Sequence, residues 1–296
     1  MATRFISVFS GKGGVGKSVL TVALADYISS VKITKRKPKV LVLDFDDQSS
    51  SSRDLIGEET VVRQGEKKET LPDVVDNLQF LGSVDDYVSR IVRTREVPSD
   101  RSRKTKLGEV DVIHSINDGA IRNYLKNSSP EKSKKIAENL RAYFSGIYDL
   151  VFIDLPGSNI PNDYSLIGLF LAERFILPTT CSPMEIFSFP RTFKLLNALH
   201  LEKGKKGSAQ ILGVVLNMMN KGSKVWRRRQ EEMEELAKSH DTKIYERHLT
   251  HSVSLTNMGV DPNVHLKRED GKYELAWDRV RKLALEILPD LGYKKK

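Results

Sequence analysis

An eight-residue stretch near the start of the chain has the composition and spacing of a phosphate-binding loop. Residues 11–18 read Gly-Lys-Gly-Gly-Val-Gly-Lys-Ser and satisfy the pattern G-x-x-x-x-G-K-S. Glycines let the backbone approach an anion and point N–H groups at it. In such loops the lysine, here Lys17, contacts the β- and γ-phosphates, and the hydroxyl of Ser18 binds Mg²⁺. The stretch therefore predicts a nucleoside triphosphate ligand. The residues expected to contact it here are Gly11, Lys12, Gly13, Gly14, Val15, Gly16, Lys17, Ser18 and Val19.

The segments on either side of this loop have the periodicities that it requires. Residues 5–9 read as a short buried strand, and residues 19–28 carry apolar side chains at helical spacing. A glycine-rich turn before an ordinary helix is the alternative interpretation. The complete pattern between a strand and a helix favours the phosphate loop, with the helix N-terminus adding attraction for the anion.

Two carboxylates follow the next predicted strand, over residues 39–43. If the extended conformation continues, Asp44 and Asp46 lie on the same side, because side chains alternate along a strand. Open α/β sheets bind ligands at the carboxyl ends of their strands, so this pair is placed to orient Mg²⁺-bound waters and an attacking water. Solvated turn residues are the alternative.

A third carboxylate ends a predicted buried strand over residues 148–153. Asp154 is followed by Leu155 and then by the Pro156-Gly157 pair, an arrangement that is typical of a Walker B strand and its switch loop. An apolar run ending in Asp is common in α/β proteins, so the assignment depends on its combination with the phosphate loop. The predicted Mg²⁺ ligands, direct or through water, are Ser18, Asp44 and Asp154.

The second lysine of the loop narrows the family. Residues 12–18 resemble the deviant Walker A motif of the ParA/MinD class of P-loop ATPases. In that class the first lysine, here Lys12, crosses a dimer interface to the nucleotide of the partner subunit. Residues 44–48 are similar to the switch I motif Asp-x-Asp-Pro-Gln, which implies that Asp46 positions the hydrolytic water. The resemblance thus makes Lys12, Lys17 and Asp46 the expected catalytic residues.

The chain departs from this family pattern at two positions. Asp47 replaces the usual proline of switch I, and Gly157 replaces the second proline of Asp-x-Pro-Pro, so both loops are expected to be less rigid. Asn217, at the end of the predicted strand 211–216, corresponds to the residue that reads adenine in the family, with Asp261 and Pro262 in the segment that closes over the base. A turn-forming asparagine is the competing interpretation of Asn217.

The basic residues are concentrated. Between positions 201 and 230 there are eight basic residues and one acid, a net +7, within a chain of net charge +9. Some of these cations begin a predicted helix, where the macrodipole disfavours positive charge. ParA-type proteins bind nonspecific DNA through surface lysines and arginines, so the resemblance implies DNA contacts, although a solvated face is the plain alternative. The expected DNA-binding residues are Lys224, Arg227, Arg228 and Arg229, with residues 90–106 as a second basic candidate.

The overall composition favours a globular, unanchored protein. The chain has 296 residues, 39% of them hydrophobic, which suffices for one large core, and it has a single cysteine, Cys181. One cysteine provides neither an internal disulfide nor a sulfur cluster site, and a reducing cytoplasm fits. The first strand begins too early for a signal peptide, and no apolar run is long enough for a membrane span. His248 and His251 have H-x-x-H spacing without further ligands, which favours structural histidines.

Buried apolar runs alternate with helical stretches, so we predict an α/β fold with a predominantly parallel twisted sheet and helices on both faces. We expect one domain over residues 1–296, with a long polar insertion after the second strand, at about 49–108, holding one or two helices. The strands are predicted at 5–9, 40–43, 110–113, 150–153, 175–177 and 211–216. The helices are predicted at 17–30, 71–78, 84–92, 130–144, 164–171, 187–199, 225–239 and 275–288.

These features together resemble a ParA-like partition ATPase that uses ATP/ADP and Mg²⁺. The resemblance implies a homodimer with ATP, nonspecific DNA and a ParB-like centromere-binding protein as partners, and a nucleoid-associated location. A MinD-like membrane-cycling ATPase is one alternative, but Pro289 is expected to interrupt the last helix and only residues 290–296 follow. The single cysteine argues against a nitrogenase-type iron protein. A cargo- or conjugation-positioning ATPase stays open.

Overall fold

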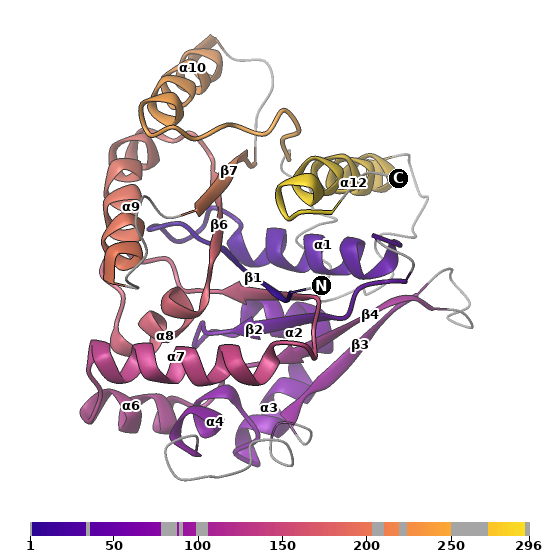
Figure 1. The fold of residues 1–296 in the computed structure, drawn as a ribbon. Coiled ribbons are helices and arrows are strands. Elements are labelled where there is room, and N and C mark those ends of the chain that lie inside the picture. The colour runs from indigo at the N-terminus through magenta and orange to yellow at the C-terminus, as the bar shows by residue number, and fades with distance from the viewer. Residues whose placement is uncertain are drawn as a thin grey trace.

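The fold is described from a computed structural model (Figure 1). It describes residues 2–33, 36–77, 88, 91–98, 106–202, 210–218, 224–249 and 272–293. The strands of the described part are β1 (Arg4–Val8), β2 (Val40–Asp44), β3 (Arg93–Pro98), β4 (Lys106–Ile113), β5 (Leu150–Asp154), β6 (Arg174–Thr179) and β7 (Gln210–Leu216). The helices are α1 (Lys17–Ser30), α2 (Ser50–Ile56), α3 (Glu58–Glu66), α4 (Leu71–Asn77), α6 (Asp118–Lys126), α7 (Pro130–Phe144), α8 (Asp163–Leu171), α9 (Pro183–Glu202), α10 (Lys224–Ser239) and α12 (Lys272–Asp290).

The strands form one sheet in the order β3-β4-β2-β5-β1-β6-β7. All neighbouring pairs are parallel except β3 with β4. This confirms the predicted α/β fold with a predominantly parallel sheet. Strand β5 lies between β2 and β1, and Asp154 is the register partner of both Asp44 and Val8. The carboxyl ends of the three strands that carry the predicted site therefore meet at one edge.

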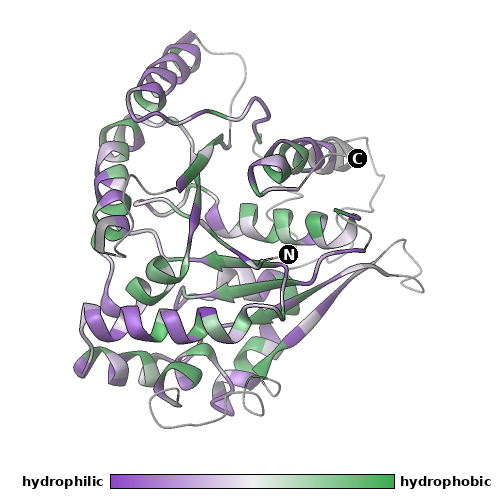
Figure 2. Cartoon of the chain, in the orientation of Figure 1, coloured by the Kyte–Doolittle hydropathy of each residue, from purple (hydrophilic) through white to green (hydrophobic). Residues whose placement is uncertain are grey.

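Helices cover both faces of this sheet and enclose two apolar cores. Helices α1 and α12 pack on one face, and α7 and α8 cover the other (Figure 1). The strands are green and hydrophobic in the middle of Figure 2, whereas the outward surfaces of α7 and α10 are largely hydrophilic. Strands β2 and β5 are buried along their whole length, which explains their uninterrupted apolar runs.

The insertion contains more regular structure than the expected one or two helices. Its described residues include the helices α2, α3 and α4, of which α4 matches the prediction, and β3 adds an antiparallel edge strand beside β4. The sequence of β3 is Arg-Thr-Arg-Glu-Val-Pro, which has no alternation of apolar and polar residues, so its pattern gave no strand signal. Most of the predicted helix 84–92 lies outside the described residues. Helix α6 was also not predicted.

The last helix corrects a second expectation. Pro289 does not interrupt α12, which continues to Asp290. A proline in the final turn removes one backbone hydrogen bond where the chain is about to leave the helix, so its cost there is small. Leu291 then donates its N–H to the Ile287 carbonyl at 3.2 Å. The other predicted helices at 17–30, 130–144, 164–171, 187–199 and 225–239 are confirmed within a few residues at their ends.

Candidate nucleotide-binding site

The phosphate loop connects β1 to α1, as the motif requires. Gly14 and Gly16 have φ of 79° and 82°, backbone conformations that favour glycine. Gly16 is the N-cap of α1, no side chain caps the helix, and its first turn has no acid. The first N–H groups of a helix have no partner inside it. In α1 they are left for an external anion, which is the arrangement that binds phosphates.

Three glycines of the site are needed because other groups pack directly on them. A Cβ on Gly11 would lie 1.8 Å from Asn159 Oδ1, and one on Gly16 would lie 2.2 Å from Asn217 Nδ2. A Cβ on Gly157 would lie 2.5 Å from Gly13 N. The glycine at position 157 therefore lets the switch loop after β5 lie against the backbone of the phosphate loop. A Cβ on Gly13 or Gly14 would meet no atom within 4 Å, so the loop has open space on the side that a side chain would occupy there.

Lys17 begins α1 and is 7% exposed. Its Nζ donates to the Lys12 carbonyl oxygen at 3.4 Å, a long contact that holds the ammonium inside the loop. Burial lowers the pKa of Lys17, and the nearby charges of Asp154 and Asp46 offset part of that change. Among the described residues no carboxylate forms an ion pair with Lys17, and a buried ammonium in that state gains strongly from an added anion.

Asp154 differs from the other carboxylates of the site in its hydrogen bonding. It is fully buried, and neither of its oxygens has a described residue in good hydrogen-bond geometry, although the hydroxyls of Ser18 and Ser51 lie close enough to favour its charged form. Burial raises its pKa to about 6, while Ser18 and the charge of Lys17 offset part of that rise. Two unpartnered oxygens beside the hydroxyl of Ser18 fit a hard divalent cation, since Mg²⁺ prefers one or two carboxylates together with substrate phosphates. The residues present therefore fit Mg²⁺.

Asp44 has a different environment from Asp154, although the two are register partners. Its Oδ2 accepts hydrogen bonds from Ser51 Oγ, Ser52 N and Ser52 Oγ at 2.8, 3.1 and 2.8 Å, and its Oδ1 accepts from Asp46 N at 3.1 Å. Burial and the charge of Asp154 raise its pKa to about 8. Asp44 thus holds the start of α2, and its oxygens are already engaged by the chain itself.

Asp46 does not continue the strand, which corrects the expected alternation. Strand β2 ends at Asp44, whose side chain accepts the Asp46 N–H and turns the chain. Asp46 Oδ1 then accepts from Gln48 N at 3.0 Å. Burial raises the pKa of Asp46, and the charge of Lys17 is among the effects that lower it. The half-buried carboxylate accordingly lies near the phosphate loop, but through a turn and not through strand periodicity.

Asn217 contacts the phosphate loop in the structure. Its Nδ2 donates to the Val15 carbonyl at 2.8 Å, and its Oδ1 accepts from Met218 N at 2.9 Å. The side chain is 5% exposed. These contacts tie the end of β7 to the loop, a role that sequence reasoning missed. Adenine recognition by Asn217 stays a prediction, and Asp261 and Pro262 lie outside the described residues.

The structure adds three polar residues to the site that sequence reasoning did not name. Ser51 and Ser52 hold Asp44, as described above. Asn159, in the switch loop, packs on Gly11 and accepts a hydrogen bond from Thr192 of α9 at 3.1 Å. The Ser-rich run 49–52 was visible as a composition signal, but its partner was not, because Asp44 and Ser51 meet only through the turn between β2 and α2.

The predicted DNA-binding residues lie at the start of α10, which projects from the body (Figure 1). Lys224, Arg227 and Arg228 are exposed, and Arg228 pairs with Glu232 at 3.2 Å. Arg229 is half-buried, and its charge lowers the pKa of the buried Cys181 thiol, although burial raises that pKa overall to about 12. Consecutive helical residues point about 100° apart, so the three arginines do not share one face.

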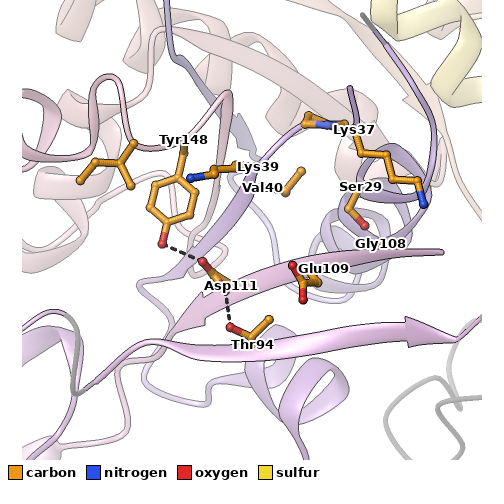
Figure 3. A pocket seen from close by; sticks show the side chains of 11 residues that line it. Ser29, Lys37, Lys39, Val40, Thr94, Gly108, Glu109, Asp111 and Tyr148 are labelled. Carbon is orange, nitrogen blue, oxygen red and sulfur yellow. Dashed lines mark hydrogen bonds between the residues drawn. The ribbon is translucent and has the colours of Figure 1, made fainter. Parts of the chain in front are cut away.

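A pocket of about 490 Å³ lies at the opposite edge of the sheet (Figure 3). Its wall includes Asp111, whose oxygens accept from Tyr148 Oη at 2.9 Å and Thr94 Oγ1 at 2.5 Å. Exposed Lys37 and Lys39 also line it. The pocket shares no residue with the phosphate loop.

The part of the chain that the structure describes has no ready-made metal cluster. No group of three or more His, Cys, Asp or Glu side chains there is placed to hold a metal by itself, so a cation at Asp154 would need Ser18, phosphates or water as further ligands. His248 is described, whereas His251 is not. Within the same residues, no helix combines the length and the apolar character needed to cross a bilayer.

Comparison with known structures supports the fold. The chain is similar to a variant of Cyanothece McdA in complex with ATP, with 18% identity, a TM-score of 0.71 and coverage of 99% of this chain and 98% of the other. It is similar to pNOB8 ParA bound to nonspecific DNA, with 17% identity, a TM-score of 0.64 and coverage of 99% and 100%. It is also similar to cobyrinic acid a,c-diamide synthase from Mycobacterium smegmatis with bound ADP and magnesium, with 16% identity, a TM-score of 0.65 and coverage of 98% and 96%. At these identities the likeness establishes the fold.

Comparison with curated protein sequences gave no match. The family model described as the CobQ/CobB/MinD/ParA nucleotide binding domain matches residues 6–257, from the first strand to beyond the last strand of the sheet. This range includes the phosphate loop, both switch segments and Asn217. The chain therefore belongs to the CobQ/CobB/MinD/ParA nucleotide-binding family.

Proposed function

We propose that this chain is an Mg²⁺-dependent ATPase of the ParA type, which dimerises on ATP, binds DNA without sequence preference and takes part in plasmid or chromosome segregation. The observation that carries the ATPase assignment is Asp154. Its two unpartnered, fully buried oxygens lie near Lys17 and Ser18, at the mouth of a loop whose helix N-terminus is uncapped. That combination of open anion and cation positions favours a nucleotide with its divalent cation.

Each residue of the site has a separate role in the proposed phosphoryl transfer. The N–H groups at the start of α1 and the Lys17 ammonium bind the phosphates, and Ser18 with Asp154 would hold Mg²⁺, which neutralises charge on the transferring phosphate when bound. Asp46 accepts a hydrogen bond from the attacking water and orients it. Asp44, engaged by Ser51 and Ser52, fixes the turn that carries Asp46. No protein nucleophile is needed.

Two features support a dimer formed across the nucleotide edge. The Lys12 side chain is half-buried and has no ion-pair partner among the described residues. Ile160, Met184 and Phe187 are 88%, 68% and 72% exposed, and they follow the carboxyl ends of β5 and β6 at the edge that bears the phosphate loop. Exposed large apolar side chains are typical of association surfaces. Lys12 would then reach the nucleotide of the partner subunit.

The DNA and protein partners follow from charge and family membership. The exposed Lys224, Arg227 and Arg228 carry positive charge on a projecting helix, which suits phosphate contacts without base readout. We propose a ParB-like protein as the partner that stimulates hydrolysis, and a cytoplasmic, nucleoid-associated location. A cargo-positioning ATPase uses the same nucleotide cycle. An adjacent gene for a small DNA-binding protein with centromere-like repeats would favour segregation over cargo positioning.

Two variants separate hydrolysis from dimerisation. Asp46→Ala should bind ATP, accumulate as a dimer and hydrolyse slowly, because only water positioning is lost. Lys12→Ala should bind ATP but lose both dimerisation and turnover. Light scattering with ATP and Mg²⁺, alongside phosphate release, distinguishes the two. A wild-type chain that stays monomeric with a slowly hydrolysed ATP analogue would contradict the dimer model.

A further inference from the structure

A buried ion pair joins the edge strand β3 to the helix that follows the phosphate loop. Arg95 Nε donates to Asp26 Oδ1 at 2.8 Å and Arg95 Nη2 donates to Asp26 Oδ2 at 2.7 Å. The two side chains are 5% and 0% exposed. Burying both charges costs so much hydration that such a pair stabilises little compared with apolar residues of the same size. Its two-pronged geometry, by contrast, fixes the relative position of the elements that it joins.

The same guanidinium also contacts a third element. Arg95 Nη1 donates to the Leu55 carbonyl at 3.4 Å, near the C-terminal end of α2, where a cation is favoured by the helix dipole. Asp54, the preceding residue, lies close enough for the charge of Arg95 to act on its carboxyl group. Arg95 of the insertion therefore contacts α1 and α2 at once, away from the nucleotide.

Helix α2 connects the Arg95 contact, at its C-terminal end, to Asp44, which its first turn contacts. It has seven residues, so its two ends are close together. Its first turn supplies Ser51 and Ser52 to the Asp44 carboxylate, and Asp44 in turn accepts the Asp46 N–H. A shift of α2 against α1 would thus move the segment 44–48 relative to the phosphate loop.

We propose that Arg95 is a positioning residue: with Asp26 it holds α2 against α1, so that Asp44 and Asp46 are placed for hydrolysis. This inference rests on the proposed ATPase function, although its structural half does not depend on turnover. Phosphate binding is left to residues 11–18, which Arg95 does not contact. The expected signature is therefore a loss in kcat with little change in KM for ATP.

The test uses the double variant Arg95→Met/Asp26→Leu. Arg95→Met alone leaves Asp26 as an unpaired buried charge and puts the fold at risk, whereas an apolar pair of similar size is tolerated in place of a buried ion pair. Arg93→Met is the matched control. Arg93 lies on the same strand and pairs with Glu69 at 3.0 Å, in the loop between α3 and α4, so the control removes an ion pair of β3 that does not involve Asp26 or α2.

Two measurements are made on the full chain, amide hydrogen exchange without nucleotide and steady-state ATP hydrolysis. In the double variant we expect faster exchange over residues 44–56, a kcat lower by about tenfold, and a KM for ATP within about twofold of wild type. The control should match wild type in both. Unchanged exchange over residues 44–56 would overturn the positioning role, as would an unchanged kcat in an active background. A wild type without ATP turnover would refute the ATPase proposal instead, and the exchange result would still decide whether the ion pair holds α2.

Discussion

Both edges of the sheet carry aspartates, and Asp154 at the carboxyl edge differs in its hydrogen bonding from two aspartates at the amino edge. At the carboxyl edge, Asp154 is buried with neither oxygen engaged by a described residue. At the amino edge, Asp111 accepts hydrogen bonds from Tyr148 and Thr94 (Figure 3), and Asp149 accepts two from Arg36 at 2.7 and 2.9 Å.

We interpret this difference as the one between a carboxylate that serves the structure and one that serves a ligand. Buried polar groups are almost always hydrogen-bonded, because an unsatisfied group costs free energy. A protein with an unsatisfied buried group in its binding site has a lower free energy of unfolding without the ligand, and ligand binding raises that free energy. The two aspartates at the amino edge are thus satisfied by the chain itself, whereas we interpret Asp154 as a carboxylate left for a ligand.

The largest effect is expected from Lys17→Ala. The affinity for ATP should fall by about 100-fold, because a lost charge-assisted contact costs up to about 3 kcal/mol. The fold should persist, since the lysine serves the phosphates. Equilibrium binding of a fluorescent ATP analogue, with circular dichroism as a check of folding, measures this. Wild-type affinity in a folded variant would remove the functional distinction between the two edges.

DNA binding can be compared between two double variants that each remove two exposed cations, one pair on α10 and one pair at the amino edge of the sheet. Arg227→Ala/Arg228→Ala should weaken duplex binding equally for unrelated sequences and reduce the slope of log K against log salt by up to about 2, at about 0.9 per phosphate contact. Lys37→Ala/Lys39→Ala removes two exposed cations from the opposite edge and should leave the slope unchanged. Filter binding over a salt series, with ATP and then ADP, tests both. Equal losses in the two variants would indicate a nonspecific charge effect.

Stability should change in opposite directions at the two edges. Without ligand at pH 7.5, Asp154→Asn should raise the free energy of unfolding by about 1 kcal/mol or more, because it replaces a buried charge that Ser18 and Lys17 compensate only in part. Asp111→Asn should lower it by about 1 kcal/mol, because a charged acceptor is replaced by a neutral one. Urea titrations measure both. With ATP and Mg²⁺ the wild type should gain stability and Asp154→Asn should not. Destabilisation by Asp154→Asn in the absence of ligand would contradict our interpretation of the carboxyl edge.

The smallest effect is the pH dependence of the difference in unfolding free energy between Asp154→Asn and wild type, measured without ligand. The pKa of Asp154 is raised from 3.8 to about 6 in the folded chain. The protonated carboxyl group therefore contributes its full stabilisation of the fold below pH 3.8, and this stabilisation is lost as the pH rises through about 6. The stability advantage of Asp154→Asn should therefore be absent near pH 4, grow up to about pH 6 and stay constant above. Thermal melts of both proteins from pH 4 to 8 measure it. If the stability advantage of Asp154→Asn does not depend on pH, it arises from packing and not from the charge of Asp154.

The predictable parts of the molecule were those with a local signal. Glycine spacing and hydrophobic periodicity, which are local patterns of a few residues, predicted the phosphate loop, the buried strands β2, β5 and β7, and helices such as α1 and α7. Strand β3 was missed because its main buried anchor, Arg95, is a charged residue that meets Asp26 far away in sequence. The expected alternation of Asp44 and Asp46 failed because a side-chain hydrogen bond ends the strand early.

The sequence by itself determined the α/β fold, the phosphate loop and the identity of the carboxylates near it, because motif spacing and periodicity are local properties of the chain. Tertiary structure alone decided which carboxylate is hydrogen-bonded by the chain and which is not. Asp44 and Asp154 read alike, each an acid at the end of an apolar strand. They differ because α2 places two serine hydroxyls 2.8 Å from Asp44, whereas the described hydroxyls near Asp154 are not in good hydrogen-bond geometry, and such a difference arises only when distant segments pack together.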